Sequence, residues 1–89
     1  MVRRPRWIKV DGEYLHVNDV RWLLYERDQR CAYCRQEISR LVDFTLDHVV
    51  PLAKGGKHEF ENLVGCCSSC NRDKGQMSAA EYLETKRER

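Results

Sequence analysis

The stretch Cys67-Ser-Ser-Cys70-Asn-Arg-Asp-Lys74, with its earlier counterpart Cys31-Ala-Tyr-Cys34, decides the fold of this sequence. Two residues separate the cysteines of each pair, and this spacing lets both sulfurs of one tight turn point at the same ion. Four thiolates make the closed tetrahedral shell of a structural zinc site. We therefore predict that one Zn²⁺ ion, which stabilises the fold and does no chemistry, is held by Cys31, Cys34, Cys67 and Cys70.

The chain has five cysteines, so one is left over. Two disulfides are the alternative to a metal, but cytoplasmic thiols stay reduced, and paired cysteines there more often bind metal. Cys66 ends an apolar segment, and we expect it to be a buried core thiol. An exchange of Cys66 for Cys67 as ligand is the alternative, although Cys66 and Cys70 are spaced less favourably for a metal-binding turn.

The segment before the first cysteine pair predicts a β-hairpin and a helix. Residues 7–10 and 13–17 flank Asp11-Gly12, a dipeptide typical of a type I′ turn. A helix over residues 19–28, capped by Asn18, should follow. Its apolar face is predicted to carry Val20, Leu23 and Leu24, and core or hairpin packing is expected for Trp7 and Trp22.

The remaining elements follow from β-branched runs and from capping signals. Residues 41–50 predict a strand that Pro51 ends, and residues 62–65 predict a second, shorter strand. The second cysteine pair should open a helix that ends at Gly75. The stretch Ser78-Ala-Ala-Glu81 is a capping box and predicts a final helix.

The length of 89 residues predicts a single domain over residues 1–89. We divide it into an N-terminal hairpin and helix (1–30), a zinc-framed core (31–75) and a C-terminal helix with a basic tail (76–89). An apolar core of this size gives modest stability, so a metal staple is expected. The sequence has no signal-peptide pattern and no run long enough to cross a membrane, which favours a cytoplasmic protein with no membrane partner.

The polar residues least explicable by folding are Asp47, His48, Asn62 and Asn71. Asp47 and His48 interrupt the apolar run Leu46-Asp-His-Val-Val50. Taken singly, the Asp-His pair would be a surface feature, Asn62 a turn residue and Asn71 a helix cap. Their spacing inside the cysteine frame favours a common chemical role.

These motifs resemble the HNH (His-Asn-His) endonuclease family. The resemblance covers Cys31 to Gly75 and consists of Cys31-x2-Cys34, Asp47-His48-x2-Pro51, Gly55-Gly56, Glu61-Asn62-Leu63 and Cys67-x2-Cys70-Asn71-x2-Lys74-Gly75. It implies a small α+β fold with a ββα-metal, treble-clef-like core stapled by a four-cysteine zinc site. The third signature residue, often histidine in the family, is Asn71 here, which leaves the metal less defined.

The resemblance also implies roles for the four polar residues. His48 would be the general base, Asp47 and Asn71 would ligate a catalytic ion, and Asn62 would orient the ring of His48 through its side-chain carbonyl. Oxygen ligands suit Mg²⁺ or Mn²⁺, and an imidazole is well suited to accept a proton near neutral pH. An ion with only two protein ligands keeps positions open for water and phosphate.

Four cationic residues flank this predicted site and are candidates for phosphate contact. They are Arg72, Lys74, Lys54 and Lys57, and solvated helix or loop charges are the alternative. His16 and His58 are expected at the surface, with a phosphate contact by His58 as the alternative. The formal net charge of +2 favours a polyanion only weakly.

We therefore predict a divalent-metal-dependent DNA endonuclease that acts on double-stranded DNA in the cytoplasm of a bacterium or a phage-infected cell. Sequence specificity is expected to be low or to come from a partner, because few elements remain to read base edges. A protein partner or a homodimer is the expected assembly. The alternatives are a non-catalytic zinc-knuckle module that binds nucleic acid and a zinc domain that binds protein. Neither would need a base beside an open metal site.

Overall fold

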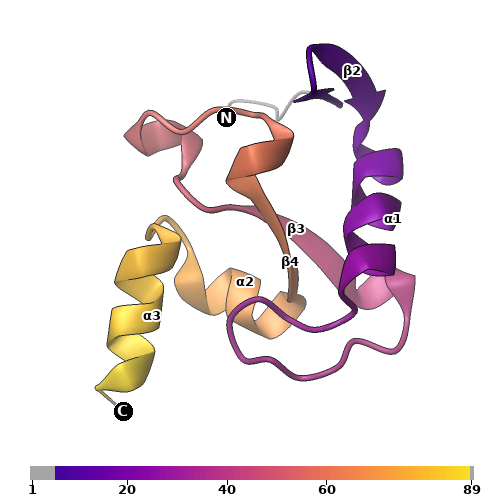
Figure 1. Ribbon diagram of the computed structural model, residues 1–89. Coiled ribbons are helices and arrows are strands. Elements are labelled where there is room, and N and C mark those ends of the chain that lie inside the picture. Colours follow the sequence, from indigo (N-terminus) through magenta and orange to yellow (C-terminus); the bar gives the residue numbers. More distant parts are fainter. Residues whose placement is uncertain (1–5, 89) are drawn as a thin grey trace.

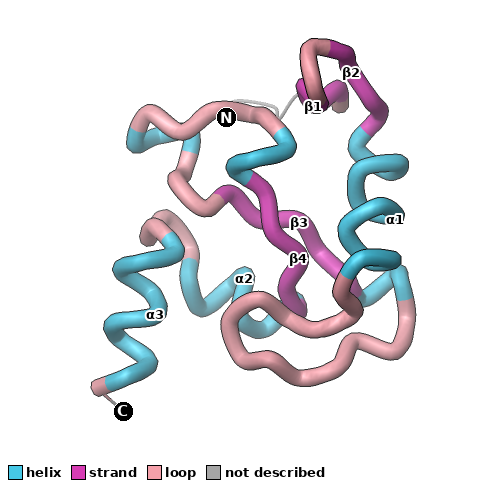
Figure 2. The backbone as a smooth tube through the Cα atoms, viewed as in Figure 1, coloured by secondary structure: helices cyan, strands magenta, loops and turns pink. Residues whose placement is uncertain are grey.

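The computed structural model of the protein describes residues 6–88. Within this part the chain forms two antiparallel two-stranded sheets and three α-helices, as expected for a small α+β fold (Figures 1 and 2). The order is β1 (Trp7–Val10), β2 (Glu13–His16), α1 (Val17–Arg27), β3 (Phe44–His48), β4 (Leu63–Cys67), α2 (Ser68–Lys74) and α3 (Ala79–Arg87). The consecutive β3, β4 and α2 form the predicted ββα unit.

The N-terminal hairpin β1–β2 turns at Asp11-Gly12, as predicted. Both residues have positive φ, 49° at Asp11 and 82° at Gly12, which a type I′ turn requires. The predicted cap of the next helix was wrong. Helix α1 begins directly after β2, so His16, the last strand residue, is the N-cap, and its Nδ1 accepts a hydrogen bond from Asn18 N at 3.1 Å.

The buried face of α1 differs from the predicted one. Val20 and Leu24 are buried as expected, but the third buried residue is Tyr25, and Leu23 is 42% exposed. Neither tryptophan lies in the core, since Trp7 is 57% and Trp22 47% exposed. Trp7 does pack within the hairpin, as predicted, because its ring lies edge-on to that of His16 at 5.5 Å between centroids. The tyrosine ring packs edge-on against Phe44 at 5.1 Å between centroids and occupies the space that faces the central hairpin.

Strand β3 is shorter at both ends than the predicted strand over residues 41–50, and β4 begins and ends later than the predicted strand over residues 62–65. Residues 41–43 form a 3₁₀ turn before β3, and residues 60–62 form another before β4. The register pairs Phe44 with Cys67 and His48 with Leu63. A Cβ atom at Gly65 would lie 1.7 Å from the Phe44 ring, so only glycine allows this ring to cross the hairpin.

The core lies between α1 and the central hairpin. Cys66 is fully buried in it, which confirms the predicted core thiol, and burial raises the pKa of this thiol to about 12. The buried apolar residues are Ile8, Val20, Leu24, Tyr25, Cys31, Tyr33, Ile38, Phe44, Leu63, Cys66, Cys70 and Tyr82. Figure 1 shows α1 on one side of this hairpin and α3 on the other.

The C-terminal helices begin and end as the capping signals in the sequence predicted. Helix α2 ends at Gly75, whose positive φ of 55° suits a residue without a side chain. Ser78 and Glu81 form the predicted capping box at the start of α3. Within residues 6–88, no helix combines the length and the apolar character needed to cross a membrane.

Candidate metal centre and nuclease site

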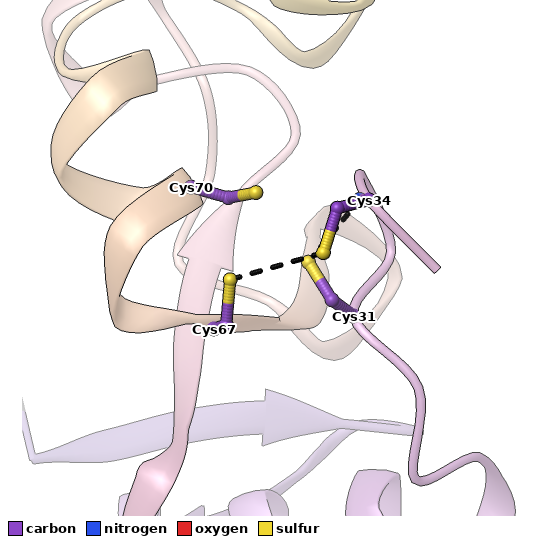
Figure 3. A group of neighbouring side chains, drawn as sticks. All are labelled: Cys31, Cys34, Cys67 and Cys70. Carbon is purple, nitrogen blue, oxygen red and sulfur yellow. Dashed lines mark hydrogen bonds between the residues drawn. The ribbon is translucent and has the colours of Figure 1, made fainter. Parts of the chain in front are cut away.

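The two cysteine turns converge on one point, as Figure 3 shows. Cys31 and Cys34 lie on the turn after α1, Cys67 ends β4, and Cys70 lies in the first turn of α2. The four sulfur atoms all lie within 4.8 Å of one another. Sulfurs on a tetrahedral zinc are separated by about 3.8 Å, given a zinc–sulfur distance of about 2.3 Å. None of the five cysteines forms a disulfide in the described chain, so this cluster can hold a metal ion.

The backbone around the cluster stabilises negative charge on sulfur. Burial opposes ionisation of Cys31, but backbone N–H groups of Cys34, Cys67 and Tyr33 donate to its sulfur and lower the pKa of the thiol to about 7. Two of these bonds are seen from Cys34 N and Tyr33 N, both at 3.4 Å. A thiolate is the form that ligates metal.

Asp47, near the end of β3, is buried at 3% exposure and held by two side chains. Its Oδ2 accepts a hydrogen bond from the Tyr33 hydroxyl at 2.5 Å and lies 3.0 Å from the Lys74 ammonium. Burial, followed by this hydrogen bond to Asp47, raises the pKa of the Tyr33 hydroxyl far above its usual value, so Tyr33 acts as a donor. The other carboxylate oxygen, Oδ1, makes no hydrogen bond or ion pair with any residue from 6 to 88.

Asn71, on α2, is oriented by the neighbouring strand. Its Nδ2 donates to Thr45 Oγ1 at 3.1 Å and to the carbonyl oxygen of Leu46 at 3.3 Å. A carbonyl oxygen only accepts, so the amide nitrogen must face the strand. The side-chain oxygen of Asn71 therefore points away from these contacts and is available as a ligand.

His48, at the end of β3, is 4% exposed and lies against a second imidazole. Its Nε2 lies 2.9 Å from Nδ1 of His58, and the ring centroids are 5.1 Å apart. His58 was predicted to lie at the surface, but it is half-buried, because the β3–β4 loop folds this histidine back onto the strand end. Its contact with phosphate stays a prediction. Because one nitrogen of the pair donates and the other accepts, the contact couples the tautomers of the two rings.

Asn62 makes contacts that differ from the predicted one. Its Oδ1 accepts from Val50 N at 2.9 Å, and its Nδ2 donates to the carbonyl oxygens of Val50 and Lys57 at 2.9 and 2.8 Å. The amide therefore closes the β3–β4 loop and does not contact the ring of His48 through its carbonyl. It lies at the end of a 3₁₀ turn, where it reaches the loop backbone on the far side.

Of the four predicted phosphate-binding residues, one is buried and three are exposed. Lys74 is 2% exposed, which corrects its prediction as a phosphate contact, because its ammonium is occupied by Asp47 and by the carbonyl oxygen of His48 at 3.1 Å. Lys54 is exposed and forms an ion pair with Glu81 at 2.7 Å. Arg72 and Lys57 are exposed.

Sequence reasoning missed two residues of this site. In the sequence, Tyr33 is only one of the two residues between Cys31 and Cys34, and His58 is only a residue of a predicted loop. A tyrosine between two cysteines is a weak signal, and both contacts depend on chain segments that meet only in the folded protein. What the fold brings together is Asp47 and His48 on β3 with Lys74 on α2, while Asn71 on the same helix binds the strand at Thr45 and Leu46.

The fold and the site define a class: a small α+β domain in which a four-cysteine group supports a ββα unit that carries a carboxylate, an imidazole and an amide. The family model described as HNH endonuclease matches residues 31–86. The chain therefore belongs to the HNH endonuclease family.

Two relatives show where such a domain occurs. The chain is 43% identical over 56 residues to the CRISPR-associated endonuclease Cas9 of Corynebacterium diphtheriae, a match that covers 62% of this chain and 5% of that protein. The crystal structure of the Type II-C Cas9 enzyme from Actinomyces naeslundii superposes with a TM-score of 0.68 at 33% identity, over 75% of this chain and 8% of that one. The chain thus corresponds to a small part of each relative.

Proposed function

We propose that this domain is a DNA endonuclease that uses one divalent ion and His48 as the general base. The observation that supports this proposal is the packing of helix α2 against strand β3. The strand presents Asp47 and His48 at its end, and the helix lies against the same strand through Asn71 and Lys74. Family membership supports nuclease chemistry in general, and these contacts support the assignment of roles.

The residues present fit a hard divalent cation. Asp47 offers Oδ1, and Asn71 offers a side-chain oxygen whose direction is set by the two bonds of its amide nitrogen. Oxygen donors of this kind suit Mg²⁺ or Mn²⁺, and two protein ligands leave room for water and phosphate oxygens. When bound, the ion would neutralise charge on the phosphate and on the leaving oxygen.

His48 would take a proton from the attacking water. For this role one ring nitrogen must be unprotonated, and the contact with His58 offers a way to select it. If Nε2 of His48 donates to Nδ1 of His58 across 2.9 Å, then Nδ1 of His48 is the nitrogen with the lone pair. His58 is thus a positioning residue in this proposal. Asn62 would act one step further away, by closing the loop that carries His58.

The four-cysteine cluster would hold Zn²⁺ with no open position. The cluster thereby differs from the proposed catalytic site at Asp47 and Asn71, called here the oxygen-lined site, where chemistry needs ligands that can exchange. The cluster joins the turn that contains Tyr33 to the start of α2, so it holds in place the two segments that contact Asp47. A structural role for this ion follows from its closed shell.

Double-stranded DNA is the proposed substrate, with exposed Arg72 and Lys57 as the candidate phosphate contacts. Both relatives are named as Cas9 enzymes, and one is a CRISPR-associated endonuclease. The chain spans only 5% and 8% of these relatives, so the choice of target is proposed to come from a protein partner, a second copy of the domain or further chain. In-line hydrolysis would leave a 5′-phosphate and a 3′-hydroxyl.

A plasmid-nicking assay tests the proposal. The protein should convert supercoiled plasmid to open circles with Mg²⁺ or Mn²⁺ and not with EDTA. His48→Ala should abolish cutting and leave DNA affinity and the metal content of the cysteine cluster unchanged, whereas Lys9→Met serves as a surface control that cuts normally. Tight DNA binding with no cutting in any metal would instead indicate the non-catalytic zinc-knuckle module.

A further inference from the structure

Lys74 places a buried positive charge beside the proposed ligand of the catalytic cation. Its side chain is 1% exposed, and its ammonium lies 3.0 Å from Asp47 Oδ2 and 3.1 Å from the carbonyl oxygen of His48. A surface lysine could swing away into water, but this one is enclosed by β3 and its own helix. The ammonium is therefore part of the electrostatics of the site.

The charges of the proposed ligand set cancel before any ion arrives. Asp47 is the one carboxylate in this set, Asn71 is neutral, and Lys74 offsets the carboxylate in a direct ion pair. Asp73, the next acidic residue on α2, accepts a hydrogen bond from the Tyr82 hydroxyl at 2.9 Å. A divalent cation entering at Oδ1 of Asp47 thus meets the negative carboxylate and, bonded to its other oxygen, the positive ammonium of Lys74.

Such a site attracts a divalent cation weakly, because the interaction of two charges falls only as the inverse of their separation. The ammonium lies beyond the carboxylate, so it offsets part of the attraction that the carboxylate exerts on the cation. A phosphodiester of the substrate would add the missing negative charge and a further oxygen ligand at the open positions.

We propose that Lys74 makes binding of the catalytic ion depend on substrate phosphate. This inference rests on the proposed function. The free domain holds the ion loosely, and the ion and the DNA bind together. By linkage the ion must then increase the affinity for DNA by the same factor by which DNA increases the affinity for the ion.

Binding of Mn²⁺, measured from the paramagnetic resonance signal of the free ion, tests this directly. The titration is done in the His48→Ala background, which keeps the duplex intact. There a short DNA duplex should tighten Mn²⁺ binding by about tenfold or more. Lys74→Met keeps the stem of the side chain and removes the charge. It should tighten Mn²⁺ binding to the DNA-free protein by about tenfold or more, and the further gain from the duplex should shrink.

Tyr33→Phe is the matched control. It removes the other hydrogen bond to the same oxygen of Asp47 but changes no charge, and its ring can keep the edge-on contact with Tyr82 at 5.3 Å between centroids. We expect it to change Mn²⁺ affinity of the DNA-free protein by less than about threefold, because only the hydrogen bond is lost. An equal tightening in Tyr33→Phe and Lys74→Met would overturn the charge argument.

The comparison of the His48→Ala protein with and without duplex does not depend on whether Lys74→Met folds. Equal Mn²⁺ affinity in those two conditions would overturn the proposal even if the plasmid is cut normally. Conversely, a protein that never cuts but binds Mn²⁺ only with DNA would support this inference and defeat the proposed function. The two proposals can therefore fail separately.

Discussion

The sulfur cluster and the oxygen-lined site share helix α2 but are built in opposite ways. The cluster takes four ligands from two tight turns, all within 4.8 Å of one another, and is closed. The proposed second site would use one oxygen of Asp47 and one of Asn71, and each of these side chains is held by hydrogen bonds to its neighbours. In our proposal, the zinc ion has a complete shell of protein ligands that serves stability, whereas the catalytic ion keeps positions open for the substrate.

In our proposal, this difference places stability and activity on neighbouring residues. Cys70 and Asn71 are adjacent in α2, and Cys70 belongs to the four-cysteine cluster, whereas Asn71 is a proposed ligand of the catalytic ion. Changes in the cluster should therefore act on folding first, and changes in the proposed catalytic site should act on cutting first. The tests below examine this division, beginning with the change that should have the greatest effect.

Loss of the cluster ion should unfold the domain. Cys67→Ala is expected to remove on the order of 10 kcal/mol of folding free energy, which is comparable to the whole stability of a small domain. Circular dichroism and melting should show an unfolded chain. Cys66→Ala is the matched control, since it removes a buried thiol outside the cluster and should cost only about 1–2 kcal/mol. Native spectra for Cys67→Ala would contradict a structural role for the ion.

Loss of a ligand in the open site should instead leave a folded, inactive protein. Asn71→Ala is expected to lower the cutting rate by more than about 100-fold, because even outer-shell partners of a metal typically matter 10- to 100-fold. The melting temperature should stay close to that of the wild type. A large drop in melting temperature would show that the two sites are not separable along α2.

Opening the β3–β4 loop should cost less activity than removing the base. Asn62→Ala loses three hydrogen bonds to the backbone of Val50 and Lys57, so the loop that carries His58 should loosen. We expect a decrease in the cutting rate of about 10- to 100-fold, smaller than that of His48→Ala. A loss as large as that of His48→Ala, measured in the same nicking assay, would point to a direct role in the chemistry.

The histidine pair can be tested with a graded substitution. His58→Ala should slow cutting by about tenfold, as expected for a residue that orients the base. His58→Asn should restore part of this loss, because its side-chain oxygen can take the place of Nδ1 as acceptor from His48. Equal rates for the two variants would exclude a role for this hydrogen bond.

The smallest effect is expected at the capping box of α3. Ser78→Ala removes the side-chain acceptor for Glu81 N and should lower the free energy of unfolding by about 1 kcal/mol. Cutting should be unchanged. Ser39→Ala, at an exposed loop position, is the control for the loss of a hydroxyl. A change in cutting for Ser78→Ala would show that α3 influences the site.

Short-range signals in the sequence determined much of this protein. The two Cys-x2-Cys turns, the Asp11-Gly12 hairpin and the Ser78–Glu81 capping box each depend on residues within a few positions, so local geometry is enough to recognise them. The family motif around Asp47-His48 and Asn71 added the candidate site. The bounds of β3 and β4 were harder to predict from the sequence, because a short 3₁₀ turn takes the place of strand just before each of them.

Only the tertiary structure decided what surrounds the candidate residues. Tyr33 reaches Asp47 across 14 positions of sequence, Lys74 binds the carbonyl oxygen of His48 across 26, and His58 returns to His48 through a loop. No local pattern encodes such contacts, because they depend on how β3, β4 and α2 pack. For this reason Lys74 looked like a surface cation in the sequence, whereas folding buries its charge at the centre of the site.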